Sequence, residues 1–313
     1  MQPSLLRRLL LSLALAGGVT AAAVELPLRW RWSNPTPHGN NLNDLAVRAG
    51  LHVAVGDRGR IYASEDLMTW AVLAAPTTRQ LRAVAFVGAR IVAAGEAGTL
   101  LHGDANGPLT AATVTPPTAD WFEGVAASPL VAVAVGDNAA IYTSATGGLI
   151  WQRVANPGFS DWLRGVPFGN STFVTVGEDG FVAISTDRRT RTPRPRPATH
   201  HLNRVTWDGA RFLAVTDRGA VITSANGSTW QADAGAAGAT NELNAVAAGG
   251  GRQWIAGEAV LRSRTAAGQP WGDDFAAAQP PPRATYLSAV WSGTALLAGG
   301  RTGLLAEGVR TND

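Results

Sequence analysis

The chain has 313 residues, of which 46% are hydrophobic, 36 are Gly, 18 are Pro and none is Cys. The lack of cysteine excludes disulfides, thiol chemistry and cysteine-based metal sites. Every basic side chain is arginine, and 26 basic residues oppose 23 acidic ones, so the chain has no excess of basic charge of the kind that nucleic-acid binding needs, and we expect no nucleic-acid partner.

The first 23 residues have the pattern of a secretory signal peptide. Arg7 and Arg8 give a positive start, residues 9–19 form an apolar run, and three alanines at positions 21–23 offer a cleavage site. The apolar run is too short to span a bilayer as an anchor. We therefore expect residues 1–23 to be removed and the mature protein to be periplasmic or secreted, with no transmembrane anchor after cleavage.

A short apolar run of the type L-x-x-V recurs along the rest of the chain at intervals of 39 to 44 residues. The seven runs start at Leu42, Leu81, Phe122, Leu163, Leu202, Leu243 and Leu287. A fixed period near 40 indicates copies of one small structural unit, stacked or arranged in a ring.

Each unit is predicted to contain four short strands. In the first unit these are residues 42–45, 52–55, 61–64 and 70–73. A Gly-Asp or Gly-Glu turn (Thr-Asp once) follows the first six starts by fourteen residues, and Gly300 follows the seventh by thirteen. Such turns tolerate the positive φ of a tight hairpin. Four strands per 40 residues predict one all-β domain over residues 24–313, a seven-bladed β-propeller with four-stranded antiparallel blades.

The two ends of the chain are predicted to share a blade. The fourth strand of a unit often starts with Trp, as at Trp70, Trp151 and Trp230, but the last unit stops after its third strand. Trp30 lies twelve residues before Leu42, where it has no unit of its own. The N-terminal strand is therefore expected to complete the last blade and close the ring, which removes the open sheet edges.

Residues 188–196 hold five arginines in the fourth unit, where the Trp strand is expected. These are Arg188, Arg189, Arg191, Arg194 and Arg196. One interpretation is a docking strip for an acidic partner. The other is a degenerate outer strand whose arginines are solvated.

Three segments resemble the Asp-box, or bacterial neuraminidase repeat, S-x-D-x-G-x-x-W: residues 64–70, 144–151 and 224–230. Together with the V-A-V-G-D-x-G-x-I and L-R-G-V patterns, they make the chain similar to the propeller family of the photosystem II stability and assembly factor and its secreted bacterial relatives. The resemblance covers roughly residues 28–308 and implies the propeller fold. Asp66 keeps the acid of the box, whereas Thr146 and Asn226 replace it.

Enzymatic chemistry has few candidates. Resemblance to sialidases would imply an arginine triad and a Tyr–Glu pair, but Tyr62 and Tyr142 share one repeat position and are expected to be packing residues. A glycoside hydrolase needs two carboxylates facing each other across a sugar. The six acids of the Gly-Asp/Glu turns share one ring face, where they either form a site or act as six copies of a turn cap. No pattern predicts a cofactor, a metal site or a catalytic residue.

The residue before each unit start is expected on the same face as these turns. It is aromatic at Trp121, Trp162 and Tyr286 but polar in the other units, so the repeat alone does not explain the aromatics. Aromatic rings beside carboxylates suit sugars or peptides. Alternatively, the tryptophans wedge between blades. The predicted ligand-binding residues, expected around one depression, are Trp121, Trp162, Tyr286, Asp120, Asp161 and Arg164.

Arg82, Arg164 and Arg204 follow unit starts closely and are expected to reach the central channel or this rim. The sequence therefore predicts a non-catalytic binding or assembly module that contacts a protein or glycan ligand through one ring face. The alternative is a carbohydrate-active enzyme, a glycoside hydrolase or sialidase-like protein, that uses acids on the same face.

Overall fold

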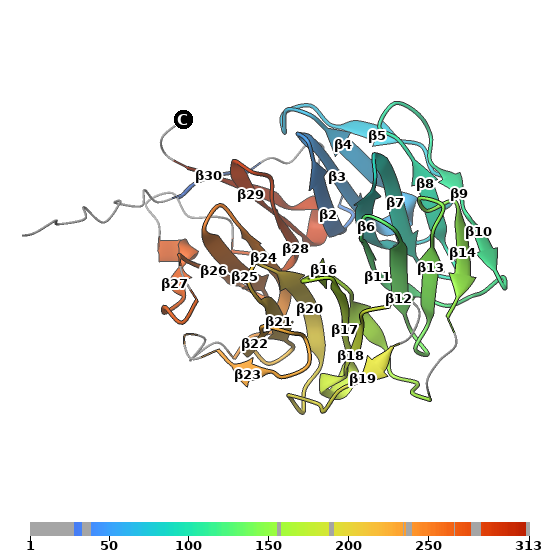
Figure 1. Cartoon of the computed structure of the whole chain (residues 1–313). Helices are drawn as coiled ribbons and strands as arrows, with labels where there is room; N and C mark the ends of the chain where they lie inside the picture. The colour runs from blue at the N-terminus through green and yellow to red at the C-terminus, as the bar shows by residue number, and fades with distance from the viewer. Residues whose placement is uncertain are drawn as a thin grey trace, which may run out of the picture.

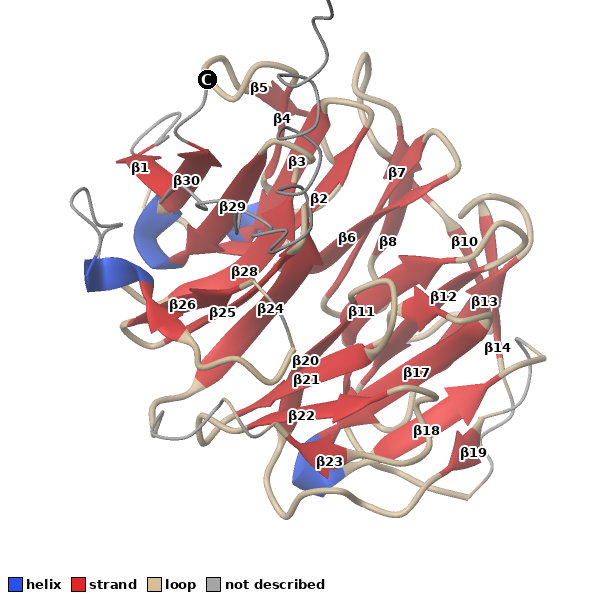
Figure 2. Ribbon diagram, turned by 60° about the vertical axis from the view of Figure 1, so that its left-hand side comes forward, coloured by secondary structure: helices blue, strands red, loops and turns tan. Residues whose placement is uncertain are grey.

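The computed structural model describes residues 28–32, 39–154, 158–187, 191–233, 235, 240–265, 267–276 and 283–310. These residues form seven small sheets arranged in a ring, as Figure 1 shows, and the predicted seven-bladed β-propeller is confirmed. Strands are the main regular element of the described residues, with four short 3-10 turns (Figure 2). The leader predicted at residues 1–23 lies outside the described residues. The described part of the chain contains no helix that is long and apolar enough to cross a membrane.

The strands run outward from the ring axis in chain order in blades 1, 2, 5 and 6. Blades 3 and 4 each contain one additional short strand, and the outer strand of blade 7 comes from the N-terminus. Blade 1 is β2 (Leu42–Arg48), β3 (Leu51–Gly56), β4 (Ile61–Ser64) and β5 (Ala71–Leu73). Blade 2 is β6 (Leu81–Val87), β7 (Arg90–Gly95), β8 (Leu100–Gly103) and β9 (Thr110–Ala111). Blade 3 is β11 (Phe122–Ala127), β12 (Ala132–Gly136), β13 (Ile141–Ser144) and β14 (Ile150–Arg153), with β10 (Thr113–Thr115) added in parallel to β14.

The second half of the ring follows the same plan. Blade 4 is β15 (Leu163–Gly165), β16 (Phe168–Gly169), β17 (Thr172–Gly177), β18 (Val182–Ser185) and β19 (Thr192–Pro193). Blade 5 is β20 (Leu202–Trp207), β21 (Phe212–Thr216), β22 (Val221–Ser224) and β23 (Gln231–Ala232). Blade 6 is β24 (Leu243–Gly249), β25 (Arg252–Gly257), β26 (Val260–Arg264) and β27 (Gly272–Asp273). Blade 7 is β28 (Tyr286–Trp291), β29 (Ala295–Gly300), β30 (Leu305–Arg310) and β1 (Leu28–Trp32).

The ring is closed by the two ends of the chain. β1 pairs antiparallel with β30 as the outer strand of blade 7, with Trp30 opposite Gly308. Trp30 is buried in a cluster with Trp254 of blade 6 and Leu296 of blade 7. The predicted closure by the N-terminal strand is therefore confirmed.

The hydrophobic core is divided among the junctions between blades. Val53 and Ile61 of blade 1 pack with Leu81 and Ile91 of blade 2, and a similar cluster joins Leu42 of blade 1 to blade 7. The short apolar strands bury one face against each neighbour, so the fold needs no single large core. The innermost strand of every blade lines the channel through the ring.

Candidate functional site

The turn between the second and third strands lies beside the residue that precedes the inner strand of the same blade. The residue after the glycine of this turn donates its backbone N–H to the carbonyl of that preceding residue. The bond runs from Asp57 to Asn41 at 3.3 Å and from Asp137 to Trp121 at 3.0 Å. The same bond recurs in all seven blades, with Thr216 in the place of the glycine in blade 5 and Thr285 as the acceptor in blade 7. A Cβ on Gly56 would lie 1.9 Å from the Asn41 carbonyl oxygen, which explains why glycine is used for this close approach. The prediction that this turn and the residue before the inner strand lie on the same ring face is confirmed.

Tyr286 does not lie on this face, and its predicted place there was wrong. In the sheet register Tyr286 pairs with Gly300 as Leu42 pairs with Gly56, so the seventh unit starts at Tyr286 and not at Leu287. The spacing to Gly300 is then fourteen residues, as in the other units. Because side chains of a strand alternate between faces, this slip of one residue moves Tyr286 into the core between blades 6 and 7, where it is 0% exposed.

Every inner strand carries a β-bulge at its first residues. The pairing with the second strand skips one residue in each blade, between Leu42 and Asp44 in the first and between Phe122 and Gly124 in the third. A bulged residue is left out of the ladder and can aim its side chain away from the sheet. The seven bulged residues are Asn43, Arg82, Glu123, Arg164, Asn203, Asn244 and Leu287.

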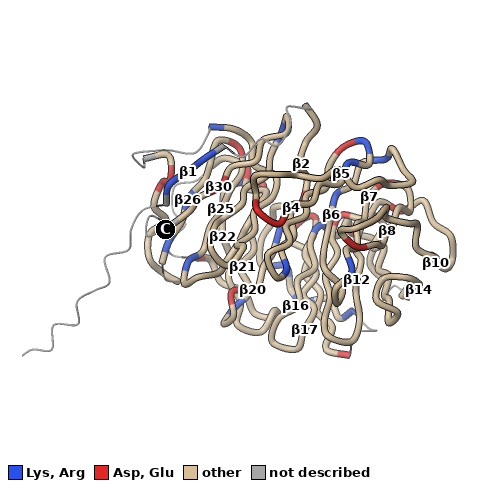
Figure 3. Tube along the Cα trace, turned by 90° about the horizontal axis from the view of Figure 1, so that it is seen from above, with Lys and Arg blue, Asp and Glu red and all other residues tan. Residues whose placement is uncertain are grey.

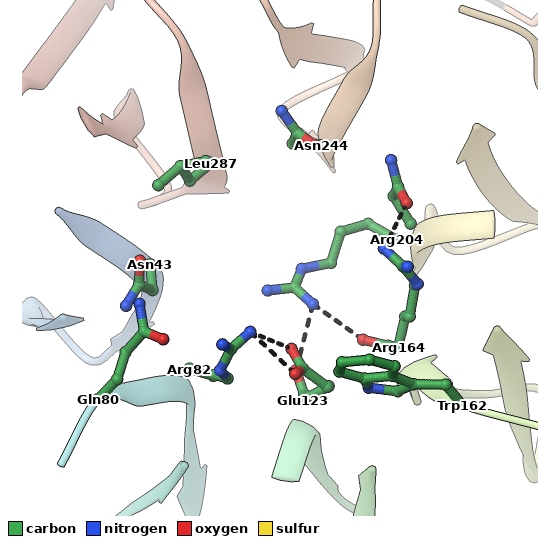
Figure 4. A pocket seen from close by; sticks show the side chains of 10 residues that line it. Asn43, Gln80, Arg82, Glu123, Trp162, Arg164, Arg204, Asn244 and Leu287 are labelled. Atoms are coloured by element: carbon green, nitrogen blue, oxygen red, sulfur yellow. Dashed lines mark hydrogen bonds and ion pairs between the residues drawn. The ribbon is translucent and has the colours of Figure 1, made fainter. Parts of the chain in front are cut away.

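All seven bulged side chains line one cavity of about 250 Å³ at the mouth of the channel (Figure 4). Gln80, Trp162 and Arg204 complete its lining. Three of the bulged residues are asparagines that donate to the first residue of the next blade's inner strand; Asn43 donates to the Leu81 carbonyl at 2.8 Å. These bonds hold neighbouring blades together around the mouth.

Three arginines converge on the cavity, as expected from their positions. Arg82 contacts Glu123 at 2.9 Å and Glu96 at 3.3 Å. Arg164 lies 3.5 Å from Glu178 and donates to the side-chain oxygen of Asn203 at 3.1 Å. Both are thus neutralised, at least in part, by carboxylates of the ring.

Arg204 has a different environment. Its side chain extends across the channel (Figure 4), and one terminal nitrogen donates to the backbone carbonyls of Arg164 at 2.9 Å and Glu123 at 3.2 Å. It also lines a second cavity of about 250 Å³ beyond the mouth. Asp44 lines that cavity; burial raises the pKa of its carboxyl, and the charge of Arg204 offsets part of this rise. Within the described residues Arg204 forms no ion pair.

The two predicted tryptophans meet beside the mouth. The rings of Trp121 and Trp162 lie edge to face with centroids 6.4 Å apart. Arg82 covers the Trp121 ring at 5.2 Å and Arg164 covers the Trp162 ring at 5.8 Å. Trp121 is 38% exposed. The rings therefore contact each other and the arginines at the rim.

The predicted acids beside these tryptophans point to their own blades. Asp120 accepts hydrogen bonds from the Tyr142 hydroxyl and from Arg153, both at 2.9 Å. Asp161 accepts one from Arg196 at 2.6 Å. Neither lines the mouth cavity. The structure thus brings together Trp121, Trp162 and Arg164 of the predicted set. Sequence reasoning missed Glu123, whose position directly after a unit start, like that of Arg82 and Arg164, was the available signal.

The repeated turn acids have two different roles. Asp57 and Asp137 accept the backbone N–H of Asn41 at 3.1 Å and of Trp121 at 2.7 Å, so they cap the turn. The longer Glu96 and Glu178 instead reach Arg82 and Arg164. The interpretation of uniform turn caps holds for these two aspartates and fails for these two glutamates. Figure 3 shows acidic and basic residues interspersed around the ring.

The arginine-rich segment is only partly described, since residues 188–190 lie outside the described ranges. Arg191 is buried over the Phe173 ring, and burial lowers its pKa to about 10. Arg194 donates to Ser228 of blade 5, and Arg196 to Asp161 and to the carbonyls of Glu178 and Asp179. The described arginines thus bind their own protein. The interpretation of a solvated outer strand was wrong for the buried Arg191, whereas strand β19 and Arg196 are exposed.

Comparisons with known proteins identify the fold. No protein-family model and no curated protein sequence matches the chain. YCF48 from Cyanidioschyzon merolae is 16% identical with a TM-score of 0.72 over 91% of this chain and 100% of that chain, and YCF48 bound to D1 peptide is 18% identical with a TM-score of 0.72 over 93% and 99%. Virginiamycin B lyase from Staphylococcus aureus is 11% identical with a TM-score of 0.78 over 91% and 99%. At these identities the likeness shows the fold alone, and it includes both an enzyme and a peptide-bound protein.

Proposed function

We propose that this protein is an exported, non-catalytic binding or assembly module, and that a partner protein docks on the ring face around the channel mouth. The observation that carries the proposal is the pair Trp121 and Trp162, each covered by an arginine, beside a cavity that opens on the same face. Tryptophan and arginine are the residues that most often dominate the binding energy of protein interfaces. The fold neighbour YCF48 bound to D1 peptide adds support by analogy.

The carbohydrate-active alternative has less support. Glycoside hydrolysis needs two carboxyl groups that flank the substrate. Glu123 is the one carboxylate among the described residues that line the mouth cavity, and it is paired with Arg82 at 2.9 Å. A glycan stacked on Trp121 would need no such pair, so glycans belong in the test as rival ligands.

Export and kinship are parts of the same proposal. The signal-peptide pattern of residues 1–23 supports export to the periplasm or medium, and sequencing the N-terminus of the mature protein tests it. The Asp-box pattern supports kinship with the secreted assembly-factor propellers. An acidic partner at residues 188–196 has less support, because in the described part of this segment Arg194 and Arg196 are engaged with Ser228 and Asp161; Arg188 and Arg189 lie outside the described residues.

The test is quantitative capture of proteins from an extract of the native cells, combined with a glycan panel. Wild type is compared with the double variant Trp121→Ala, Trp162→Ala and with Leu130→Ala. Leu130 is 64% exposed in the loop between β11 and β12, at the opposite face, and serves as the matched control. We expect a protein that is held by wild type and Leu130→Ala to be depleted at least about tenfold by the double variant.

Thermal melting of all three proteins accompanies the capture, so that loss of binding is separated from loss of fold. Equal capture of every protein by the double variant, with the fold intact, would contradict the docking face. Binding of glycans alone would contradict a protein partner.

A further inference from the structure

The mouth cavity has an excess of hydrogen-bond donors that its own residues do not satisfy. The Nε atoms of Arg82 and Arg164 and the indole Nε1 of Trp162 are buried and have no partner among the described residues. The one unsatisfied acceptor there, Oε1 of Glu123, lies 2.9 Å from Arg82. Buried donors without partners cost free energy. The three donor atoms have almost no accessible surface, so a ligand in the cavity would meet the exposed remainder of the Arg82 and Arg164 side chains, which are 26% and 30% exposed.

Among the three arginines of the cavity, Arg204 is the one that has no carboxylate partner among the described residues. Three guanidinium groups face one carboxylate among the described lining residues. Arg82 and Arg164 have carboxylate partners, but Arg204 is held only by two carbonyls, through one of its two terminal nitrogens. Arg204 thus lacks a direct counter-ion, although the carboxyl of Asp44 in the second cavity interacts with its charge, and an entering anion would supply a direct partner.

The opposite wall of the cavity has a different chemistry. Asn43, Asn244 and Leu287, from blades 1, 6 and 7, face the arginines across the mouth (Figure 4). The side-chain nitrogens of both asparagines are used in bonds to the next blade, which leaves their oxygens as acceptors for N–H groups. A peptide carries both features, a carboxylate for the arginines and N–H groups for the amides.

We propose that the channel mouth binds a single carboxylate of the partner polypeptide through Arg204 and Arg164. The adjacent segment of that polypeptide contacts Trp121 and Trp162. This inference rests on the proposed function, since it assigns the chemistry that the docking face recognises. The planar guanidinium fork matches a carboxylate by two parallel bonds. A cavity of about 250 Å³ has room for one acidic side chain or one chain end and not for a folded segment.

The carboxylate has two possible sources, an acidic side chain or a free C-terminus, and small probes distinguish them. N-acetyl-aspartate methylamide carries the first and N-acetyl-glycine the second, and acetate represents a free anion. N-acetyl-asparagine methylamide and N-acetyl-glycinamide are their neutral counterparts. Binding is followed by the NMR signal of the Trp162 indole N–H, identified by its loss in Trp162→Phe.

We expect at least one acidic probe to shift this signal saturably, with an affinity at least about tenfold higher than that of its amide. Arg204→Gln should weaken binding at least about tenfold, and Arg204→Lys, which keeps the charge without the fork, should give an intermediate loss. Arg58→Gln is the matched control, because Arg58 is exposed on the same face outside the cavity. If Arg204→Gln does not melt like wild type, Arg164→Gln replaces it.

Equal binding of acids and amides, unchanged binding by the arginine variants, or the absence of any saturable shift would overturn the proposal. These failures differ from failure of the proposed function. If the tryptophan double variant loses a partner protein while the acidic probes bind no better than their amides, the docking face is supported and the carboxylate site is contradicted. If the acidic probes bind but no protein depends on the tryptophans, the site serves a free small carboxylate and the assembly role falls.

Discussion

One methylene group separates the two roles seen at four of the repeated turn acids. The aspartates at positions 57 and 137 are short enough to accept a backbone N–H of their own blade. The glutamates at positions 96 and 178 extend past that N–H and meet an arginine of the inner strand. The same repeat position therefore stabilises the turn in some blades and sets the charge of the channel mouth in others.

The buried carboxyl group of Asp274 is predicted to make the stability of the fold depend on pH. Burial raises the pKa of Asp274 to about 6; Ser263 donates to one carboxylate oxygen at 2.9 Å, and the other has no partner among the described residues. A raised folded-state pKa means that the folded protein binds a proton more tightly than the unfolded chain. Stability should therefore fall as pH rises from about 4 to about 6 and stay low above that.

Asp274→Asn removes this dependence. We expect the variant to be more stable than wild type at pH 7.5, by on the order of 2 kcal/mol, and to match it near pH 4, where the carboxyl is protonated in both states. Urea unfolding across this pH range measures the difference. Glu65→Gln, at an exposed position, is the control. A destabilised variant at pH 7.5 would show that the charged form is favoured in the folded state.

At the scale of elements, three loops between third and fourth strands share one set of hydrogen bonds despite different residues. In blade 1, Ser64 accepts the backbone N–H of Leu67 at 2.8 Å, and Asp66 accepts the backbone N–H of Thr69 at 2.7 Å. Asn226 accepts Thr229 at 3.0 Å in blade 5, and the Thr146 hydroxyl accepts Ile150 at 2.8 Å in blade 3. An oxygen at this position is what the loop requires, and a charge is not.

This equivalence predicts the outcome of two substitutions. Asp66→Asn should keep the melting temperature near that of wild type, because the amide oxygen can accept the same N–H groups as Asn226 does. Asp66→Ala should lower it, because two N–H groups lose their acceptor. The same bonds lower the pKa of Asp66, so the contribution of its charge is present above its unfolded pKa and is lost as pH falls through the lower folded one. Equal melting of the two variants would contradict this account.

At the scale of the whole molecule, stability depends on the pairing of the N-terminal strand β1 with the C-terminal strand β30. β1 supplies the outer edge of blade 7, and Trp30 fills the junction with blade 6. Trp30→Ala should cost about 3–5 kcal/mol of unfolding free energy through the cavity that it leaves. Arg29→Ala, an exposed neighbour on the same strand, should cost little.

Deletion of residues 24–34 extends this test. It removes β1 altogether and leaves β30 as an open edge, so it should destabilise the ring more than Trp30→Ala does. Chemical unfolding of the three variants gives the order. Wild-type stability in the deletion variant would mean that blade 7 does not need the N-terminal strand.

Local patterns in the sequence were sufficient for the architecture. The 40-residue period, the apolar runs and the Gly-Asp turns predict strands and count the blades, and the lone Trp30 strand predicts closure. Each of these signals is read within one unit, because strand formation and hairpin turns are set by residues close in sequence. The same is true of the shared face that carries the turns and the tryptophans.

The sequence placed three arginines near the channel mouth, but only the tertiary structure decided how the side chains there meet. The bulge in each inner strand, which turns Glu123 and Arg82 toward the axis, is a matter of strand register, and a register error of one residue placed Tyr286 on the wrong face. The partners of Arg204 come from two other blades, as many as 81 residues away. Such contacts depend on how blades pack around the ring, and the pattern of a single repeat carries no information about them.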